Sequence, residues 1–167
     1  MPMTLLASSH LLLGVVALAT GGAVVLLPKG TPTHRVIGRA YAAAMVALCL
    51  LSFGLRGSSP FFAGYGPFHV MAVVSLVTLA FGLREVWRRA RRDWMAYHLA
   101  WMLWSYVGLV MATGSHLVGP LVRALRGPLG SGGAAMAVTA LLVWALPMLA
   151  GRRLIPRAVE RATAAAA

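Results

Sequence analysis

The sequence has few charged residues and almost no acidic ones. Only 11% of its 167 residues are charged, and 3 Asp and Glu stand against 15 Lys and Arg. Because 60% of the residues are hydrophobic, the chain has too little polar surface to cover a globular domain of this length in water. The positive charges stand in clusters between long uncharged stretches, so the net charge of +12 does not form the continuous basic face of a nucleic-acid-binding protein. The sequence therefore predicts a membrane protein with no nucleic-acid partner.

Cysteine is almost absent as well. Cys49 is the single cysteine, and it lies in the middle of an apolar run. This excludes an intramolecular disulfide and a cysteine-based metal site, so we expect Cys49 to pack as a small buried apolar residue. No Lys or Arg precedes the first apolar run. We therefore expect that run to be a retained membrane span and not a cleaved secretory signal.

Long apolar stretches are what the sequence does contain. A helix needs roughly 20 predominantly apolar residues to cross the hydrocarbon core of a bilayer. Clusters of Gly, Pro and charged residues separate the stretches, and Thr31-Pro32 predicts an N-cap followed by proline at the first helical position. We expect an all-α bundle of five transmembrane helices that forms one transmembrane domain over residues 1–167. The expected spans are approximately 4–27, 36–55, 67–83, 94–118 and 134–150.

The distribution of basic residues predicts the orientation. Cytoplasmic loops of membrane proteins carry an excess of Lys and Arg. The loop after the first span, the loop after the third span and the C-terminal tail together hold 12 of these residues, whereas Arg56, Arg123 and Arg126 are on the other side. We expect the N-terminus outside and the C-terminus in the cytoplasm of a bacterial inner membrane. The basic inner face is expected to attract anionic lipids.

Histidines are the remaining candidates for chemistry. The three acidic residues, Glu85, Asp93 and Glu160, all lie outside the expected spans. This excludes carboxylate proton relays, paired-carboxylate catalysis and a Ser-His-Asp triad within the membrane. The topology divides the five histidines between two layers. An outer layer contains His10, His69 and His116, and an inner layer contains His34 and His98.

His98 and His116 are expected on one face of the fourth span. They are 18 residues apart, which at about 100° per residue makes five whole turns and about 27 Å along the helix axis. One cofactor cannot contact both side chains. Two cofactors stacked across the bilayer could each take one of them.

Several functions are consistent with these histidines. We favour a b-type haem bound by two outer histidines, with a possible second site at His34 and His98, for electron transfer across the membrane and exchange with a quinone. Arg35 and Arg39 could bind haem propionates or lipid head groups. A second hypothesis is a zinc or copper site made of His10, His69 and His116. A third is a cofactor-free accessory or assembly subunit of a membrane complex, in which the histidines only bond helix carbonyls or water.

Two motifs carry a resemblance to a known family. Residues 34–41 read HRxxGRxY, and residues 98–109 read HxxxMxxSYxGL. Together with the His10 span and Pro67-Phe68-His69, they resemble a bacterial family of multi-pass predicted membrane proteins of unknown function, over roughly residues 5–126. The resemblance implies a membrane fold and no particular activity. A looser similarity links the chain to b-type membrane cytochromes, which implies haem bound by histidines on neighbouring helices near both membrane faces.

Overall fold

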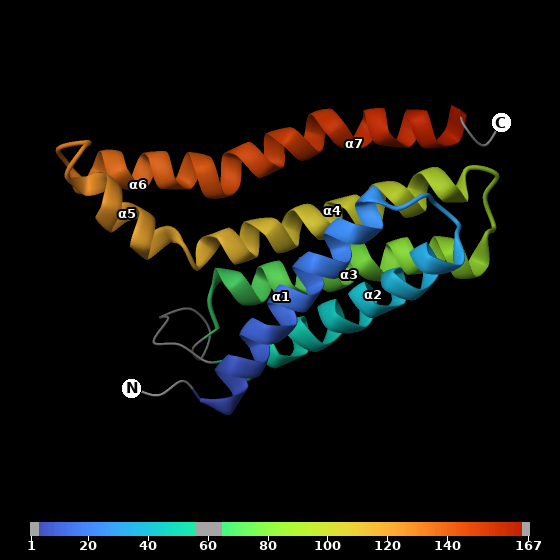
Figure 1. Ribbon diagram of the computed structural model, residues 1–167, viewed down its shortest axis with the longest axis horizontal. Helices are drawn as coiled ribbons and strands as arrows, with labels where there is room; N and C mark the ends of the chain where they lie inside the picture. Colours follow the sequence, from blue (N-terminus) through green and yellow to red (C-terminus); the bar gives the residue numbers. More distant parts are fainter. Residues whose placement is uncertain (1–3, 56–64, 165–167) are drawn as a thin grey trace.

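The computed structural model describes residues 4–55 and 65–164, and within these ranges every regular element is a helix (Figure 1). The predicted all-helical fold is therefore confirmed. The helices are α1 (Leu5–Leu26), α2 (Pro32–Ser52), α3 (Pro67–Arg88), α4 (Trp94–Ser115), α5 (Val118–Arg126), α6 (Gly132–Ala140), the π-helical turn η2 (Leu141–Ala145) and α7 (Leu146–Ala164).

Five helices are long and apolar enough to cross a membrane, as the sequence predicts. Helix α1 has 22 residues, which corresponds to about 33 Å and matches a hydrocarbon core of about 30 Å. The first four candidate spans are α1, α2, α3 and α4. The fifth is the continuous helical segment of 33 residues from Gly132 to Ala164, which joins α6, η2 and α7.

The structure corrects the second and third expected spans. Helix α2 begins at Pro32 and not near residue 36, because the Thr31 side chain accepts a hydrogen bond from the His34 backbone N–H and caps the helix. His34 is therefore in the first helical turn. Helix α3 continues beyond residue 83 to Arg88 and ends where Arg89 adopts a left-handed conformation, with φ at 44°.

The fourth and fifth expected spans also differ from the structure. Helix α4 ends at Ser115 and not at residue 118, and a separate short helix, α5, follows it. The fifth span was expected to end at residue 150, but α7 continues to Ala164. Arginines do not stop this helix, because long basic side chains can extend from it into water while the backbone stays hydrogen-bonded.

The first four spans form two antiparallel pairs, α1 with α2 and α3 with α4, while the fifth span lies along α4 (Figure 1). Helix α1 also contacts α4, and Gly21 lies against the Tyr106 side chain of that helix. A Cβ atom at Gly21 would lie 2.6 Å from the Tyr106 ring and 2.9 Å from the Tyr41 ring. The absence of a side chain there lets two tyrosines pack against the α1 backbone.

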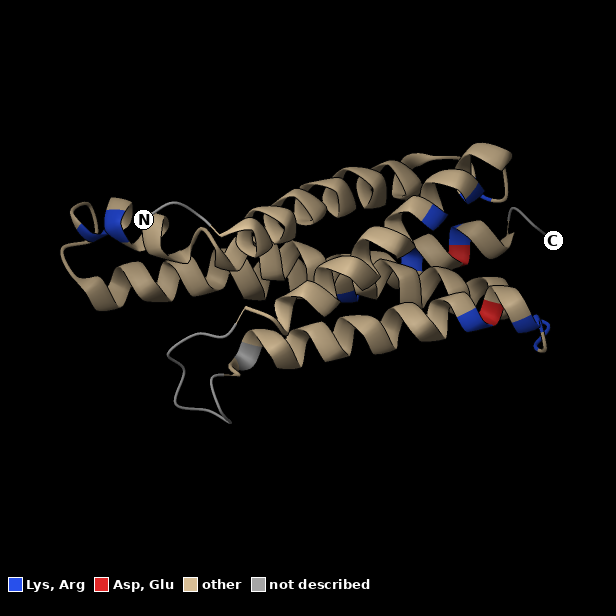
Figure 2. Cartoon of the chain, turned by 90° about the horizontal axis from the view of Figure 1, so that it is seen from below, with Lys and Arg blue, Asp and Glu red and all other residues tan. Residues whose placement is uncertain are grey.

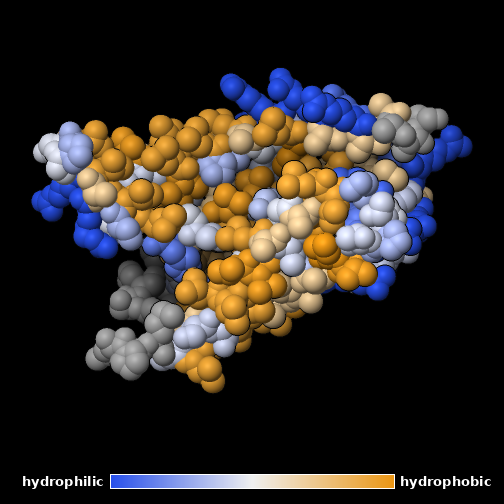
Figure 3. Space-filling model, viewed as in Figure 1, coloured by the Kyte–Doolittle hydropathy of each residue, from blue (hydrophilic) through white to orange (hydrophobic). Residues whose placement is uncertain are grey.

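The buried core is narrow, and the outer surface of the helices is apolar. Tyr41, Met45, Leu79 and Leu109 are among the buried residues that hold α1 to α4 together, and Cys49 is buried with them as predicted. Large apolar side chains such as Leu12 remain exposed. Figure 3 shows apolar residues over much of the visible surface, which is the surface that lipid chains would cover.

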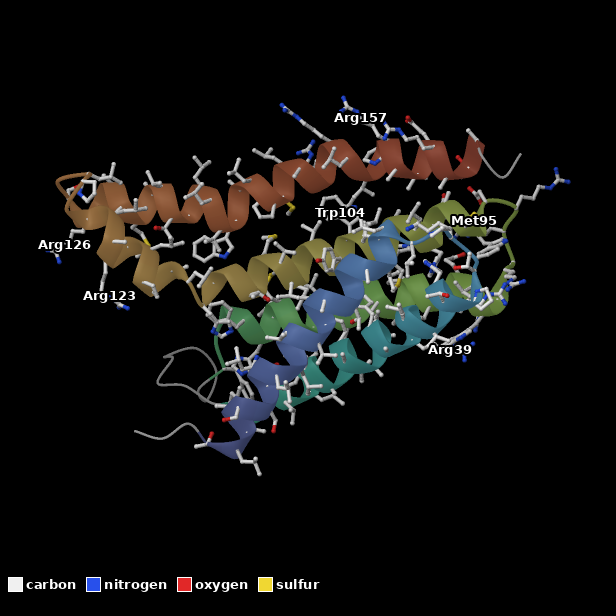
Figure 4. The ribbon with its side chains drawn as sticks, in the orientation of Figure 1. Arg39, Met95, Trp104, Arg123, Arg126 and Arg157 are labelled. Atoms are coloured by element: carbon white, nitrogen blue, oxygen red, sulfur yellow. The ribbon has the colours of Figure 1, made fainter. Side chains whose placement is uncertain are left out.

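Most of the charged residues gather at one end of the bundle, which we call the basic end (Figure 2). It contains the connections between α1 and α2 and between α3 and α4, together with the C-terminal half of α7. Asp93 and Glu160 belong to these segments, and Glu85 lies in the last turn of α3 next to them. Arg123 and Arg126 lie in α5 at the opposite end (Figure 4). Arg56 is outside the described residues.

The charge asymmetry predicts that the basic end faces the cytoplasm. In a background in which Cys49 is replaced by alanine, we expect Gly127→Cys to react with a membrane-impermeant maleimide on intact cells. Ala90→Cys, in the connection between α3 and α4, should react only after lysis. Labelling of Ala90→Cys on intact cells with protection of Gly127→Cys would reverse the predicted orientation.

The close approach at Gly21 predicts a stability effect. Gly21→Ala should lower the free energy of unfolding by about 1–3 kcal/mol, because the added methyl group overpacks the contact with the two tyrosine rings. Gly133→Ala is the matched control, since no heavy atom lies within 4 Å of a Cβ atom at that position. Unfolding of the detergent-solubilised variants checks this expectation. Equal stability of both variants would contradict it.

Candidate functional site

A cavity of about 890 Å³ opens at the basic end, between the end of α1 and helices α2, α3 and α4. This volume lies within the range of about 300–1,000 Å³ that is common for small-molecule and cofactor sites. Its apolar walls include Val24, Leu83 and Leu99. We call it the basic-end cavity, and Figure 4 shows two of its lining residues, Arg39 and Met95, at that end of the bundle.

Both sequence motifs converge on this cavity. Every fixed position of the HRxxGRxY motif lines it, and the second motif contributes a histidine, a methionine and a tyrosine. Ser105, also in the second motif, hydrogen-bonds to a tyrosine of the first motif. Residues that are more than 50 positions apart in the sequence therefore form one site. The motif residues that line the cavity are His34, Arg35, Gly38, Arg39, Tyr41, His98, Met102 and Tyr106.

His98 lines the cavity in a fixed tautomer. Its Nδ1 atom lies 2.8 Å from the backbone carbonyl oxygen of Gly82 on α3. A carbonyl oxygen only accepts hydrogen bonds, so Nδ1 carries the proton and Nε2 carries the lone pair. Metal-bound histidines commonly have this arrangement, in which the non-ligating nitrogen donates to a backbone carbonyl. The Nε2 lone pair of His98 is therefore available to bind a metal ion.

His34 lines the same cavity from α2. One of its ring nitrogens interacts with the backbone carbonyl of Val24 at the end of α1. The Nδ1 atom is buried and has no hydrogen-bond partner in the described structure, so the nitrogen that faces Val24 is Nε2. His98 thus has one ring nitrogen on a carbonyl and a lone pair on the other, and His34 has a buried Nδ1 without a partner in the described structure.

Cations surround the mouth of the cavity. Lys29, Arg35, Arg39 and Arg89 are among its lining residues, and no described lining residue is Asp or Glu. The Nζ atom of Lys29 donates to the carbonyl oxygens of Val24, at 2.9 Å, and of the next residue, at 2.7 Å. Partial burial lowers the pKa of Lys29 below its usual range. The mouth of the cavity is therefore suited to an anionic group.

Two tyrosines form the floor of the cavity, deep in the bundle. The Tyr41 hydroxyl lies 3.0 Å from the Ser105 hydroxyl, and the Tyr106 hydroxyl donates to the Leu18 carbonyl at 3.3 Å. The two rings are in edge-to-face contact, with centroids 6.3 Å apart. These contacts connect α1, α2 and α4, and they fix the inner boundary of the cavity.

The structure brings together two of the three histidines that were expected in the outer layer. The His10 ring on α1 and the His116 ring at the end of α4 have centroids 6.4 Å apart. The Nδ1 atom of His10 is buried without a hydrogen-bond partner in the described residues, and its ring interacts with the Leu48 backbone carbonyl on α2. We call these two side chains the His10–His116 pair.

His69 has a different role from that pair. Its Nδ1 atom accepts a hydrogen bond from the Gly66 backbone N–H at 3.0 Å, so its Nε2 atom donates to the Ser52 carbonyl, 3.1 Å away. Both ring nitrogens are therefore used to cap α3 and to hold it against the end of α2. Among the described residues, no three His, Cys, Asp or Glu side chains lie together as a group that could hold a metal ion.

Sequence reasoning identified the histidines and arginines of the cavity but missed its remaining polar residues. From the sequence, Lys29 counts only as a basic residue of a loop, and Tyr41 and Tyr106 are only positions in the two motifs. The motifs themselves were the signal that could have found the tyrosines. Their spacing of seven to eight residues from His34 and His98 places them about two helical turns deeper along the same helices.

The geometry of His69 predicts a stabilising role without cofactor contact. His69→Ala should lower the free energy of unfolding by about 1–3 kcal/mol through the loss of two hydrogen bonds, and it should leave the bound cofactor or metal content unchanged. Unfolding and cofactor analysis of the same purified sample test both parts. Loss of cofactor from a variant that remains folded would show that His69 is a ligand.

Comparison with known proteins places this site within a family. No curated protein and no solved structure matches the chain. Residues 7–154 match the family model described as "Predicted membrane protein (DUF2306)". The match extends beyond the expected residue 126 into the fifth span, and it includes all five histidines and both motifs. The chain therefore belongs to this family of predicted multi-pass membrane proteins.

Proposed function

We propose that the basic-end cavity binds a b-type haem and that the protein carries electrons in the membrane. One observation carries the proposal: His34 and His98, on different helices, line a single cavity and each has a ring nitrogen with an unused lone pair. His98 holds Nδ1 on a backbone carbonyl and leaves Nε2 free, and His34 has a buried Nδ1 without a partner among the described residues. Neutral imidazoles in this state are axial ligands of haem iron. The ligand atoms would be Nδ1 of His34 and Nε2 of His98.

The walls and mouth of the cavity support the same ligand. A tetrapyrrole needs apolar and aromatic surroundings, and the lining of the cavity provides both. The residues are Val24, Leu83, Leu99, Trp87 and Trp94. The two haem propionates need cations at one edge. Arg35 and Arg39 line the cavity at the basic end and would supply these cations, so that the charged groups would stay near water while the ring enters the bundle.

The carbonyl contacts would also adjust the properties of the ligands. A hydrogen bond from Nδ1 of His98 to the Gly82 carbonyl increases the basicity of Nε2 and fixes the plane of the ring. A side chain at position 82 would collide with Met102, whose sulfur would lie 2.7 Å from the added Cβ atom. Gly82 therefore keeps α3 close enough to α4 for this bond to form.

Electron transfer is the chemistry that such a haem supplies, by alternation between ferric and ferrous iron. The protein would contribute the apolar cavity, the two axial ligands and a basic face for an acidic or membrane-bound redox partner. A quinone in the bilayer is one partner of suitable chemistry. The arginine distribution further supports a bacterial cytoplasmic membrane, with the basic end inside and against anionic lipids.

The test is an absorbance spectrum of the detergent-purified protein, after incubation with hemin, in the oxidised and dithionite-reduced states. We expect a low-spin Soret band at one haem per chain. His98→Asn can keep the bond to Gly82 through its amide nitrogen while removing the Nε2 ligand, and His34→Gln can likewise keep the bond to Val24. Each variant should bind haem at least tenfold more weakly or convert it to a high-spin form.

The His10→Gln variant is the control, because His10 lies outside the basic-end cavity, and its spectrum should match that of the original protein. A flat visible spectrum in the original protein would reject the haem proposal. Bound metal in a colourless sample would favour a metal site, and the absence of both would favour an accessory subunit. An unchanged spectrum in both His34→Gln and His98→Asn would move the haem to other ligands.

A further inference from the structure

A second pair of histidines lies away from the basic-end cavity. The His10–His116 pair joins the outer part of α1 to the end of α4, with ring centroids 6.4 Å apart and ring planes at 65°. Two imidazoles that bind one metal ion from opposite sides, with metal–nitrogen distances of about 2 Å, have centroids about 6 Å apart. The separation of this pair is close to that value.

His10 has the hydrogen-bonding state of a metal ligand. Its Nδ1 atom is buried and has no hydrogen-bond partner in the described part of the chain. Because Nδ1 has no partner, Nε2 is the ring nitrogen that faces the Leu48 carbonyl, and the Nδ1 atom carries a lone pair. A buried lone pair without a donor is costly in a membrane unless a ligand satisfies it. His116 is exposed at the end of α4, which gives an ion access from that side.

The charged residues around the His10–His116 pair favour a monovalent ion. Asp93 and Glu160 lie in the segments of the basic end and Glu85 lies in the adjoining last turn of α3, so none of the three acidic residues can neutralise an ion at the opposite end. The nearest charged segment there is α5, with Arg123 and Arg126. The cost of moving an ion into an apolar site rises with the square of its charge. A monovalent ion that accepts two neutral imidazoles is therefore favoured over Zn²⁺, and among biological metals this describes Cu⁺.

We propose that His10 and His116 bind one cuprous ion at the end of the bundle opposite the basic-end cavity. The ligands are Nδ1 of His10 and one ring nitrogen of His116, and Leu48 orients the first ligand through its carbonyl. This site is independent of the proposed haem. It also differs from a three-histidine site, because His69 uses both ring nitrogens in contacts with the backbone.

The experiment measures Cu⁺ binding to the purified full-length protein by competition with bicinchoninate under reducing conditions. We expect one Cu⁺ per chain, with two nitrogen donors in the copper X-ray absorption spectrum. His10→Gln, which can keep the bond to the Leu48 carbonyl, and His116→Asn should each weaken binding at least tenfold. Ser115→Ala is the matched control next to His116 and should bind as the original protein does.

The outcomes separate this proposal from the haem proposal. Loss of Cu⁺ binding in His10→Gln and His116→Asn, with hemin binding unchanged, supports the copper site. Equal Cu⁺ affinity in the original protein and both variants would overturn it, as would preferential binding of Zn²⁺ by the same two residues. Hemin binding that depends on His10 and His116, and not on His34 and His98, would overturn both proposals. Unchanged hemin binding in each variant also confirms that the variant is folded.

Discussion

A ring N–H group inside a bilayer must find a protein acceptor, because no water is available to take its place. His69 and His98 meet this requirement with a backbone carbonyl of a neighbouring helix. The Ser52 carbonyl lies at the end of α2, where backbone acceptors lack an intrahelical partner. The contact between Ser52 and His69 therefore gives a partner to a carbonyl at a helix end and to a ring N–H at the same time. It also determines which ring nitrogen keeps its lone pair.

This constraint separates structural from reactive histidines. His69 has its second nitrogen occupied by a backbone N–H, whereas His10 and His34 each keep a buried Nδ1 without a partner among the described residues. Residue type and depth along a helix do not distinguish these cases. They differ only in what the second nitrogen meets, which depends on the residues just before α3 and on the packing of neighbouring helices.

The sequence was sufficient for the five spans, because apolar length and helical periodicity are local properties. It was insufficient for the helix ends, since capping by Thr31 and continuation of α7 past its arginines depend on single contacts and on side chains that reach water. It also could not show that His10 meets His116 while His69 turns to Ser52. Which histidines meet depends on how α1 packs across α4, where Gly21 lies against the Tyr106 ring.

The π-helical turn in the fifth span determines how that span meets α4. Within the turn, Val143 packs against Gly114 of α4. A Cβ atom added at Gly114 would lie 3.0 Å from the Val143 side chain. Further along, Gly151 faces the Trp104 ring, 3.1 Å from an added Cβ atom, and Figure 4 shows Trp104 between the two helices. One extra residue in a helical turn rotates everything that follows by about 100°. The fifth span thus consists of two α-helical segments joined by a one-residue insertion. Deletion of that one residue would turn the face with Gly151 away from α4 toward the lipid.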